Sequence, residues 1–197
     1  MSTLEPLAAP HILPYRRIAS IRVNDGSSDR VATGWFFGDS LVITAAHVFD
    51  NLTDPLITLW PGRSDADDAF FGVWTTRRFR IAKEGLCAGI FVPQPVGLSV
   101  GTFGIANIDQ SVDDRLIEVA GYEALDNGQR PVHGIGPIIS ASHSTIKYDV
   151  ITMPGQSGAP VWLDGDPDFL VGVHQTDGEG TRFSEALVLE LLAWRST

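Results

Sequence analysis

Short runs of apolar residues recur along most of the chain and are separated by Gly, Pro, Asp, Asn and Ser. The runs are rich in β-branched and aromatic residues, which is the pattern of β-strands rather than of helices. Ten strands are predicted, at residues 18–23, 32–37, 40–44, 56–60, 103–108, 116–120, 136–142, 145–150, 159–163 and 170–174. Strands this short and this regularly spaced are typical of a β-sandwich or a β-barrel.

Two segments have helical periodicity instead. Residues 44–50 (TAAHVFD) predict a short turn directly after a strand. Residues 184–195 place Leu187, Leu191 and Trp194 on one face of a helix, with Ser184 in the position of an N-cap. The stretch 85–101 is poor in charge and rich in Gly and Pro, so we expect the crossing between two halves of the chain there.

Composition supports a folded chain and excludes several classes of partner. Hydrophobic residues make up 44% of the 197 positions and charged residues 19%, which is enough apolar surface to bury a core. The 24 acidic and 14 basic residues give a formal charge of −10, so neither nucleic acid nor an anionic membrane is an expected partner. The single cysteine, Cys87, excludes an internal disulfide.

The start of the chain lacks a basic segment followed by an apolar one, and no window approaches 18 uninterrupted apolar residues. We therefore expect a cytoplasmic protein with no membrane partner. A leader removed from the sequence would make it a secreted protein instead. Nothing in the pattern predicts an oligomeric state.

The first segment that carries chemistry is residues 34–47, GWFFGDSLVITAAH. An apolar hairpin brings His47 into a tight turn after two alanines, whose small side chains let the imidazole lie against the backbone and face a cleft. Taken alone, a histidine in this position is more often a packed or capping residue than a functional one. Whether His47 is functional therefore depends on a second segment.

That second segment is residues 153–161, MPGQSGAPV, in which Ser157 lies on a sharp turn before a strand. The flanking glycines free the backbone to point successive N–H groups inward, as an oxyanion hole requires. A serine hydroxyl is a weak nucleophile by itself and becomes competent when a histidine accepts its proton. His47 precedes Ser157 by 110 residues, an order that fits a site where two β-barrels meet.

Residues 44–47 (TAAH) and 155–160 (GQSGAP) resemble the two signatures of the chymotrypsin-like serine proteases. The shorter matches at 61–62, 71–72, 103–106, 120–122 and 171–174 follow the order of the bacterial glutamyl-endopeptidase branch. Together with the strand pattern, the resemblance implies an all-β fold of two antiparallel β-barrels with a C-terminal helix. We expect an N-terminal arm at 1–17, a first barrel at 18–100 carrying His47, and a second barrel with the helix at 101–197 carrying Ser157.

The resemblance also implies an activity, that of a serine endopeptidase acting on peptide or protein substrates without a cofactor. In that reading His47 is the general base and Ser157 is the nucleophile. The backbone N–H groups of Gly155 and Ser157 form the oxyanion hole. Gln156 stands where zymogen-type relatives have the Asp that pairs with a freed N-terminal amine, so we expect this site to form without N-terminal cleavage.

The chain departs from the family pattern at the third member of the triad. The family has an Asp two residues before the Gly of an Asp-aromatic-Gly strand, and residues 101–106 (GTFGIA) place Thr102 there. Asp109 lies seven residues further on, on the opposite face by strand parity. The Asp normally fixes the tautomer and orientation of the His, and replacing it by Asn lowers kcat about 10⁴-fold.

Three explanations of this departure stay open. Thr102 could assist a Ser–His pair by accepting the imidazole N–H. An acid could reach His47 from elsewhere in the fold. The chain could also be a catalytically weakened or inactive protease-like module that binds peptides.

The resemblance further assigns a specificity pocket. The position six residues before the Ser holds an acid in relatives that cleave after Arg or Lys, and here it is Ile151, which disfavours such cleavage. Thr152 and His174 match the groups that bind a substrate carboxylate in the glutamyl branch, which predicts cleavage after Glu or Asp. Medium-sized apolar residues are the alternative, because Asp177, three residues after His174, would oppose an acidic substrate. The other histidines, His11, His133 and His143, are scattered, so no metal site is predicted.

Overall fold

The computed structural model describes residues 3–65, 69–106 and 115–196. The strands are β1 (Thr3–Pro6), β2 (Ile18–Asn24), β3 (Asp29–Gly38), β4 (Leu41–Ala45), β5 (Leu56–Pro61), β6 (Trp74–Thr76), β7 (Phe79–Ile81), β8 (Cys87–Phe91), β9 (Gly104–Ile105), β10 (Leu116–Tyr122), β11 (Pro131–Ala141), β12 (Thr145–Tyr148), β13 (Pro160–Leu163), β14 (Phe169–Thr176) and β15 (Glu179–Arg182). The helical elements are the 3₁₀ turns η1 (Tyr15–Arg17), η2 (Ala46–Phe49) and η3 (Leu125–Asn127) and the α-helices α1 (Gly97–Val100) and α2 (Glu185–Arg195).

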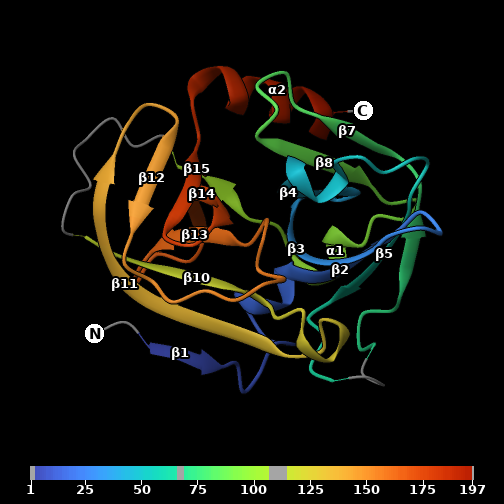
Figure 1. Cartoon of the computed structure of the whole chain (residues 1–197), viewed down its shortest axis with the longest axis horizontal. Coiled ribbons are helices and arrows are strands. Elements are labelled where there is room, and N and C mark those ends of the chain that lie inside the picture. The colour runs from blue at the N-terminus through green and yellow to red at the C-terminus, as the bar shows by residue number, and fades with distance from the viewer. Residues whose placement is uncertain (1–2, 66–68, 107–114, 197) are drawn as a thin grey trace.

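These strands form two curled sheets that lie side by side (Figure 1). The first has the order β6-β5-β2-β3-β4-β8-β7 and contains only antiparallel neighbours. In the second, six strands in the order β11-β10-β13-β14-β15-β12 close into a barrel, because β12 also pairs with β11. The N-terminal β1 adds to the edge of this second sheet beside β11. The predicted all-β class with two curled, mainly antiparallel sheets and a C-terminal helix is confirmed; the second sheet closes into a barrel, and the first forms a half-barrel.

Three apolar cores hold this arrangement together. One fills the first sheet, one fills the second barrel, and the third lies between the two and continues under α2. On β3, Phe36 belongs to the first core, whereas its neighbours Trp35 and Phe37 belong to the third, as the two-residue period of a strand requires. The second half of β3 and all of β4 are therefore buried on both faces, which fits their mainly apolar sequence there.

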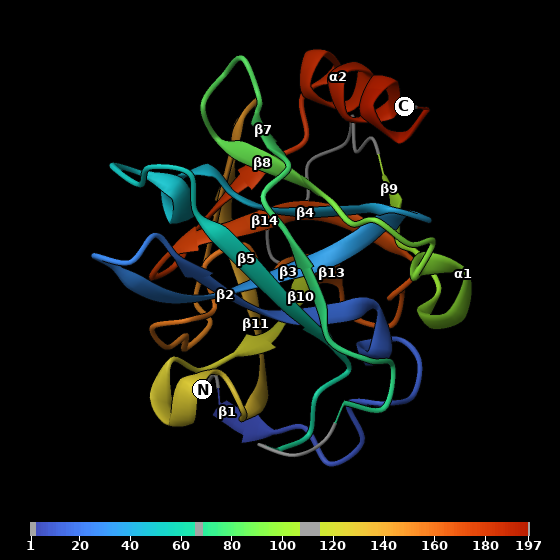
Figure 2. The same cartoon turned by 90° about the vertical axis from the view of Figure 1, so that its right-hand side faces the viewer.

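The C-terminal helix is confirmed in its details. The Ser184 hydroxyl accepts a hydrogen bond from the Leu187 N–H at 3.2 Å, which makes Ser184 the N-cap. Leu187, Leu191 and Trp194 are the buried residues of α2. The helix lies at one end of the molecule and β1 at the opposite end (Figure 2).

Several expectations from the pattern were wrong or incomplete. The stretch 85–101 contains β8, which pairs with β4 inside the first sheet, so the crossing begins only after Phe91. The short strands β1, β6, β7 and β15 were not predicted. The predicted strand at 103–108 is reduced to β9, and positions 107 and 108 lie outside the described residues.

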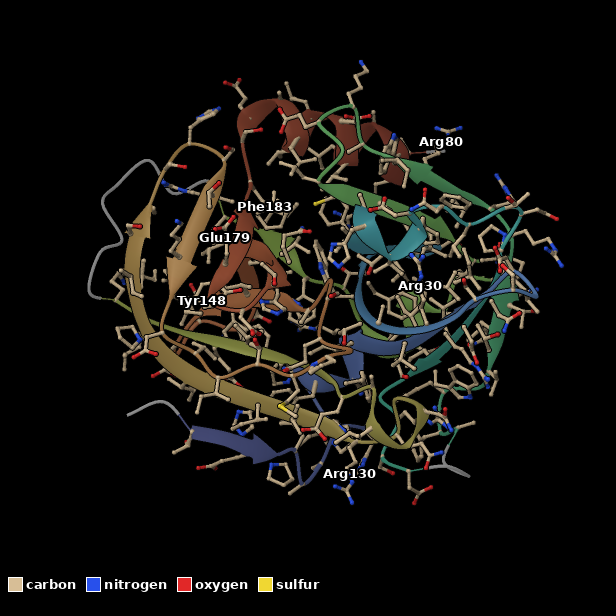
Figure 3. The ribbon with its side chains drawn as sticks, viewed as in Figure 1. Arg30, Arg80, Arg130, Tyr148, Glu179 and Phe183 are labelled. Atoms are coloured by element: carbon tan, nitrogen blue, oxygen red, sulfur yellow. The ribbon has the colours of Figure 1, made fainter. Side chains whose placement is uncertain are left out.

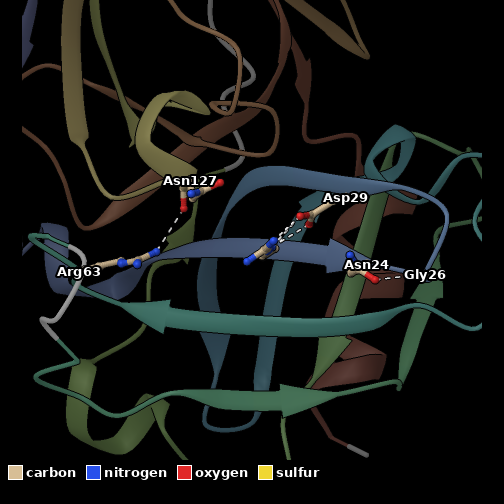
Figure 4. A network of polar contacts seen from close by, with 6 residues as sticks. Asn24, Gly26, Asp29, Arg63 and Asn127 are labelled. Atoms are coloured by element: carbon tan, nitrogen blue, oxygen red, sulfur yellow. Dashed lines mark hydrogen bonds and ion pairs between the residues drawn. The ribbon is translucent and has the colours of Figure 1, made fainter.

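A polar contact joins the two sheets away from the third core (Figure 4). Arg63 follows β5 in the sequence. Its guanidinium lies over the Trp60 ring at 4.6 Å and donates to the Asn127 carbonyl oxygen at 3.2 Å. Asn127 belongs to η3 of the second half of the chain. In the described part of the chain, no helix is long and apolar enough to cross a membrane.

Candidate active site

A cleft of about 690 Å³ brings together side chains from the two sheets. Its lining residues are His47, Thr152, Met153, Pro154, Ser157, His174, Gln175, Thr176 and Asp177. His47 comes from the first sheet and the others from the second barrel and its turns. The structure thus places the histidine and the serine of the two sequence motifs on the walls of one cavity, although 110 residues separate them.

His47 lies in η2, the 3₁₀ turn that follows β4. Ala45 at the end of β4 and Ala46 at the start of the turn are buried, and the His47 side chain is exposed to the cleft. Arg30 of β3 fixes the turn from outside: its guanidinium donates to the carbonyl oxygens of His47 at 3.3 Å, Val48 at 3.0 Å and Asp50 at 2.7 Å. Figure 3 shows Arg30 on the first-sheet side of the molecule and Tyr148 on the second-barrel side.

The turn that carries Ser157 is anchored to the first sheet through Thr33 of β3. The Thr33 N–H donates to the Ser157 carbonyl oxygen at 2.9 Å, and the Thr33 hydroxyl donates to the Gly155 carbonyl oxygen at 2.9 Å. The same hydroxyl accepts from the Tyr122 N–H of β10. On the other side, the Gly158 N–H donates to the His174 carbonyl oxygen of β14 at 2.8 Å. The position of Ser157 is therefore set by both sheets.

The backbone before Ser157 has the form that an oxyanion hole needs. Gly155 has a φ of +101°, which side chains disfavour, and a Cβ there would lie 2.3 Å from the Ala124 nitrogen. Among the described residues, neither the Gly155 N–H nor the Ser157 N–H donates to another protein group. Gln156 is fully buried, and its side-chain oxygen accepts from the Met153 N–H at 2.7 Å, which braces the turn.

The serine hydroxyl does not contact the imidazole in this structure. Ser157 Oγ donates to the carbonyl oxygen of Gln175 at 3.4 Å, and the described residues contain no hydrogen bond between Ser157 and His47. Hydrogen bonds of this kind are often long in the free enzyme and shorten when substrate binds. The two side chains face the same cavity, so both are open to the cleft.

Thr102 is not near His47. The N–H of the next residue, Phe103, donates to the Phe36 carbonyl oxygen, and Phe36 pairs with Val42 at the far end of β4. From Val42 to the end of β4 at Ala45 is about 10 Å along the strand. Among the described residues no hydrogen bond joins Thr102 to His47, so the expected role of Thr102 as a partner of the imidazole is corrected. Asp109, the other residue considered for this role, lies outside the described residues.

The imidazole is contacted instead by Gln175, which the sequence analysis did not identify. His47 Nδ1 lies 3.3 Å from Gln175 Oε1. The amide nitrogen of Gln175 donates to the Leu86 carbonyl oxygen at 2.9 Å and to Thr181 Oγ1 at 3.0 Å. Gln175 is the extra residue of a β-bulge, because the pairing of β14 with β15 shifts between His174 and Thr176. Bulges turn side chains away from the regular alternation, and no sequence motif marks this one.

The predicted pocket residues divide into two groups. His174 and Thr152 line the cleft, whereas Ile151, which is 48% exposed, is not among its lining residues. Val150, directly before Ile151, is buried in the barrel core, whereas the Ile151 side chain is turned to the surface. The expected contribution of Ile151 to substrate binding is corrected accordingly.

His174 is buried and held by a second residue that the sequence analysis did not identify. Its Nδ1 lies 2.6 Å from the Tyr148 hydroxyl. Burial lowers the pKa of His174 to about 4, an effect that His47 strengthens and Asp177 opposes. Burial also raises the pKa of Tyr148 well above its usual value, so the phenol keeps its proton. Both groups are therefore neutral near pH 7.

Thr152 lies opposite a carboxylate of the protein itself. Its hydroxyl donates to Asp177 Oδ1 at 3.1 Å. Asp177 is exposed on the turn between β14 and β15 and lines the cleft. A substrate carboxylate that used the Thr152 hydroxyl would have to take the place of Asp177.

Comparison with known proteins confirms the resemblance found in the motifs. The glutamyl endopeptidase of Bacillus licheniformis is 30% identical to the chain in an alignment 159 residues long, which covers 76% of this chain and 49% of that protein. The chain thus spans about half the length of this curated relative. No protein-family model matches the chain.

Solved structures with the same fold extend over nearly the whole chain. A Glu endopeptidase in complex with MPD superposes with a TM-score of 0.83 at 19% identity, covering 98% of this chain and 97% of that one. The protease Anisep from Arthrobacter nicotinovorans superposes with a TM-score of 0.80 at 14% identity, covering 99% of this chain and 100% of that one. At these identities the likeness establishes the chymotrypsin-like fold.

Proposed function

We propose that this chain is a serine endopeptidase that hydrolyses peptide bonds through an acyl-enzyme on Ser157. The observation that carries the proposal is the meeting of His47 and Ser157 in one cleft, beside a turn whose Gly155 and Ser157 N–H groups have no acceptor within the described protein. The relationship to a glutamyl endopeptidase supports it. Cys87 is no competing nucleophile, because it is buried and burial raises the pKa of its thiol to about 12.

The reaction follows from these positions. His47 Nε2 takes the proton of Ser157 Oγ as the oxygen attacks the carbonyl carbon of the substrate, and the new oxyanion is held by the N–H groups of Gly155 and Ser157. The imidazolium then gives that proton to the leaving amine, and the C–N bond breaks. Water, deprotonated by His47, attacks the acyl-enzyme and releases the acid product together with free Ser157.

We further propose that the substrate residue on the acyl side of the cut is Glu or Asp. The Tyr148 phenol keeps its proton and can donate it to Nδ1 of His174; in that arrangement, which this proposal adopts, the hydrogen of the neutral ring sits on Nε2. This N–H and the Thr152 hydroxyl are donors suited to a carboxylate. Asp177 works against the same preference by its charge and by occupying Thr152. The balance predicts a moderate preference for acidic residues over their amides.

The proposed activity is tested with a fluorophosphonate probe and intact-mass spectrometry between pH 6 and 9. We expect a single adduct on Ser157, lost in Ser157→Ala and retained in Ser142→Ala, which changes an exposed serine outside the cleft. A folded protein that forms no adduct at any of these pH values would refute the proposal. The preference is tested with peptides that differ only in Glu or Gln before the cut, and His174→Ala should remove the difference between them.

One observation favours a second function. The Ser157 hydroxyl donates to the Gln175 carbonyl oxygen rather than to His47, and no carboxylate among the described residues contacts His47. A protease-like module that binds peptides without cutting them would have this arrangement. Such a module would retain the test peptides in an equilibrium binding assay and would leave Ser157 unlabelled.

A further inference from the structure

We infer that Gln175 is the positioning residue of His47: its side-chain amide holds the imidazole in the tautomer that can accept the proton of Ser157. The inference rests on the proposed function and identifies what contacts the general base, since no carboxylate among the described residues does so. It is carried by the contact between Gln175 Oε1 and His47 Nδ1 and by the two hydrogen bonds that fix the other end of the amide.

The orientation of the amide follows from its partners. The carbonyl oxygen of Leu86 can only accept a hydrogen bond, so the Gln175 group 2.9 Å from it must be the amide nitrogen. The second hydrogen of that nitrogen is directed to Thr181 Oγ1 at 3.0 Å. Thr181 is only 3% exposed, so water does not compete freely for this bond. Both amide hydrogens are therefore used, and the amide oxygen faces His47.

The orientation of the amide decides the tautomer of His47. An amide oxygen can only accept, so the His47 nitrogen that faces it must carry a hydrogen. The facing nitrogen is Nδ1, at 3.3 Å. In a neutral imidazole the other nitrogen, Nε2, then has a free lone pair and can act as the general base. Gln175 thus selects the productive tautomer without being charged.

The Gln175 amide differs in its effect from an Asn that replaces the Asp of a serine-protease triad. There an Asn selects the wrong tautomer, and kcat falls about 10⁴-fold. In this chain the Leu86 carbonyl prevents the amide of Gln175 from turning its nitrogen towards His47. The tautomer is preserved, and what Gln175 lacks relative to a carboxylate is the negative charge that stabilises the imidazolium of the transition state.

The β-bulge explains how a strand residue reaches this position. In regular β-structure Gln175 would lie on the face opposite to that of His174. The shift in pairing between His174 and Thr176 makes Gln175 the unpaired residue, free to direct its side chain between Leu86 and His47. Its main-chain carbonyl meanwhile accepts from Ser157 Oγ, so the one residue contacts both members of the Ser–His pair.

Two variants of Gln175 test the role. Gln175→Met keeps a similar side-chain volume but removes the acceptor and the donors. We expect it to lower the rate of fluorophosphonate labelling and kcat roughly tenfold to a hundredfold with little change in KM, because a hydrogen bond to a group that becomes charged is lost. Gln175→Glu keeps an oxygen towards His47 and adds a charge, but its second oxygen has no hydrogen to donate to the Leu86 carbonyl. We expect it to retain labelling and to shift the acid limb of the pH profile to higher pH, because a carboxylate stabilises the imidazolium.

The controls are matched to the chemistry of each change. Gln94→Met and Gln94→Glu make the same substitutions at an exposed position outside the cleft and should leave rates and pH profiles unchanged. The variants leave the other charged or titratable groups around His47 unchanged. These groups include Arg30 on β3, Asp50 after η2, Glu84 before β8, His174 on β14 and Asp177 after β14. A shift of the acid limb in Gln175→Glu therefore reports the contact with His47.

The outcomes separate the two proposals. If the fluorophosphonate labels the wild type and Gln175→Met at the same rate and with the same pH profile, the role of Gln175 is overturned. The proposed function still stands in that case. A wild-type protein that never labels overturns the proposed function. A measurement without any variant is also available: ¹⁵N chemical shifts of the His47 ring should show the hydrogen on Nδ1, and a hydrogen on Nε2 overturns the inference directly.

Discussion

The buried His174 makes stability depend on pH in a direction that the structure specifies. Burial lowers its pKa to about 4, whereas a histidine of an unfolded chain titrates near its ordinary value of 6.5. Between these values the unfolded chain binds more protons than the native protein, so lowering the pH favours unfolding. The contribution of His174 is complete above pH 6.5 and is lost as the pH falls towards 4.

The magnitude follows from the separation of the two pKa values. At about 1.4 kcal/mol for each pKa unit, the full loss is about 3 kcal/mol, of which about 2 kcal/mol is already lost at pH 5. His174 is 3% exposed, so solvent screens the effect little. This loss is a substantial part of the stability of a typical small domain.

The assay is urea unfolding at pH 8 and pH 5, compared between the wild type, His174→Gln and His143→Gln. The wild type and His143→Gln, which changes an exposed ring, should lose about 2 kcal/mol more than His174→Gln over this interval. The other titrating groups are common to all three proteins and cancel in the comparison. If the wild type and His174→Gln lose the same free energy, the neutral, buried ring is refuted, and with it a pocket that recognises carboxylates by hydrogen bonding rather than by charge.

Three further changes probe the surroundings of the cleft. Gly158→Ala should destabilise the protein by roughly 2–4 kcal/mol in thermal unfolding, because at a φ of +88° its Cβ would lie 2.1 Å from Thr44 Oγ1; an unchanged Tm would contradict the tight turn. Thr33→Val removes the hydroxyl that joins the Gly155 carbonyl to the Tyr122 N–H and should cost about 1–3 kcal/mol, whereas an equal stability would mean that the two groups find other partners. Asp177→Asn keeps an acceptor for Thr152 but removes the charge, and should raise kcat/KM for a Glu peptide about threefold relative to its Gln counterpart; a fall in that ratio would show that Asp177 assists the substrate.

The sequence alone determined the features that depend on local periodicity. Short runs of β-branched and aromatic residues mark β2, β3 and β5, and the Ser184 cap with its apolar face marks α2, because these signals lie within one element. The two motifs around His47 and Ser157 likewise lie in short segments, and the small residues in each are required by turns that are themselves local. Strand β8 was missed because its sequence, CAGIF, lacks the β-branched run that marks the other strands.

What the tertiary structure decided is the environment of the imidazole. The family motif placed Thr102 beside His47, but Phe103, the next residue, is bonded near the start of β4, whereas His47 follows its end. The residue in contact, Gln175, is 128 positions away in the sequence and reaches His47 through an irregularity in strand pairing. Its partner Leu86 contributes a carbonyl oxygen, which every residue type possesses and no motif can mark. Contacts made by main-chain atoms and bulges depend on how two sheets pack together, so they become visible only in the folded chain.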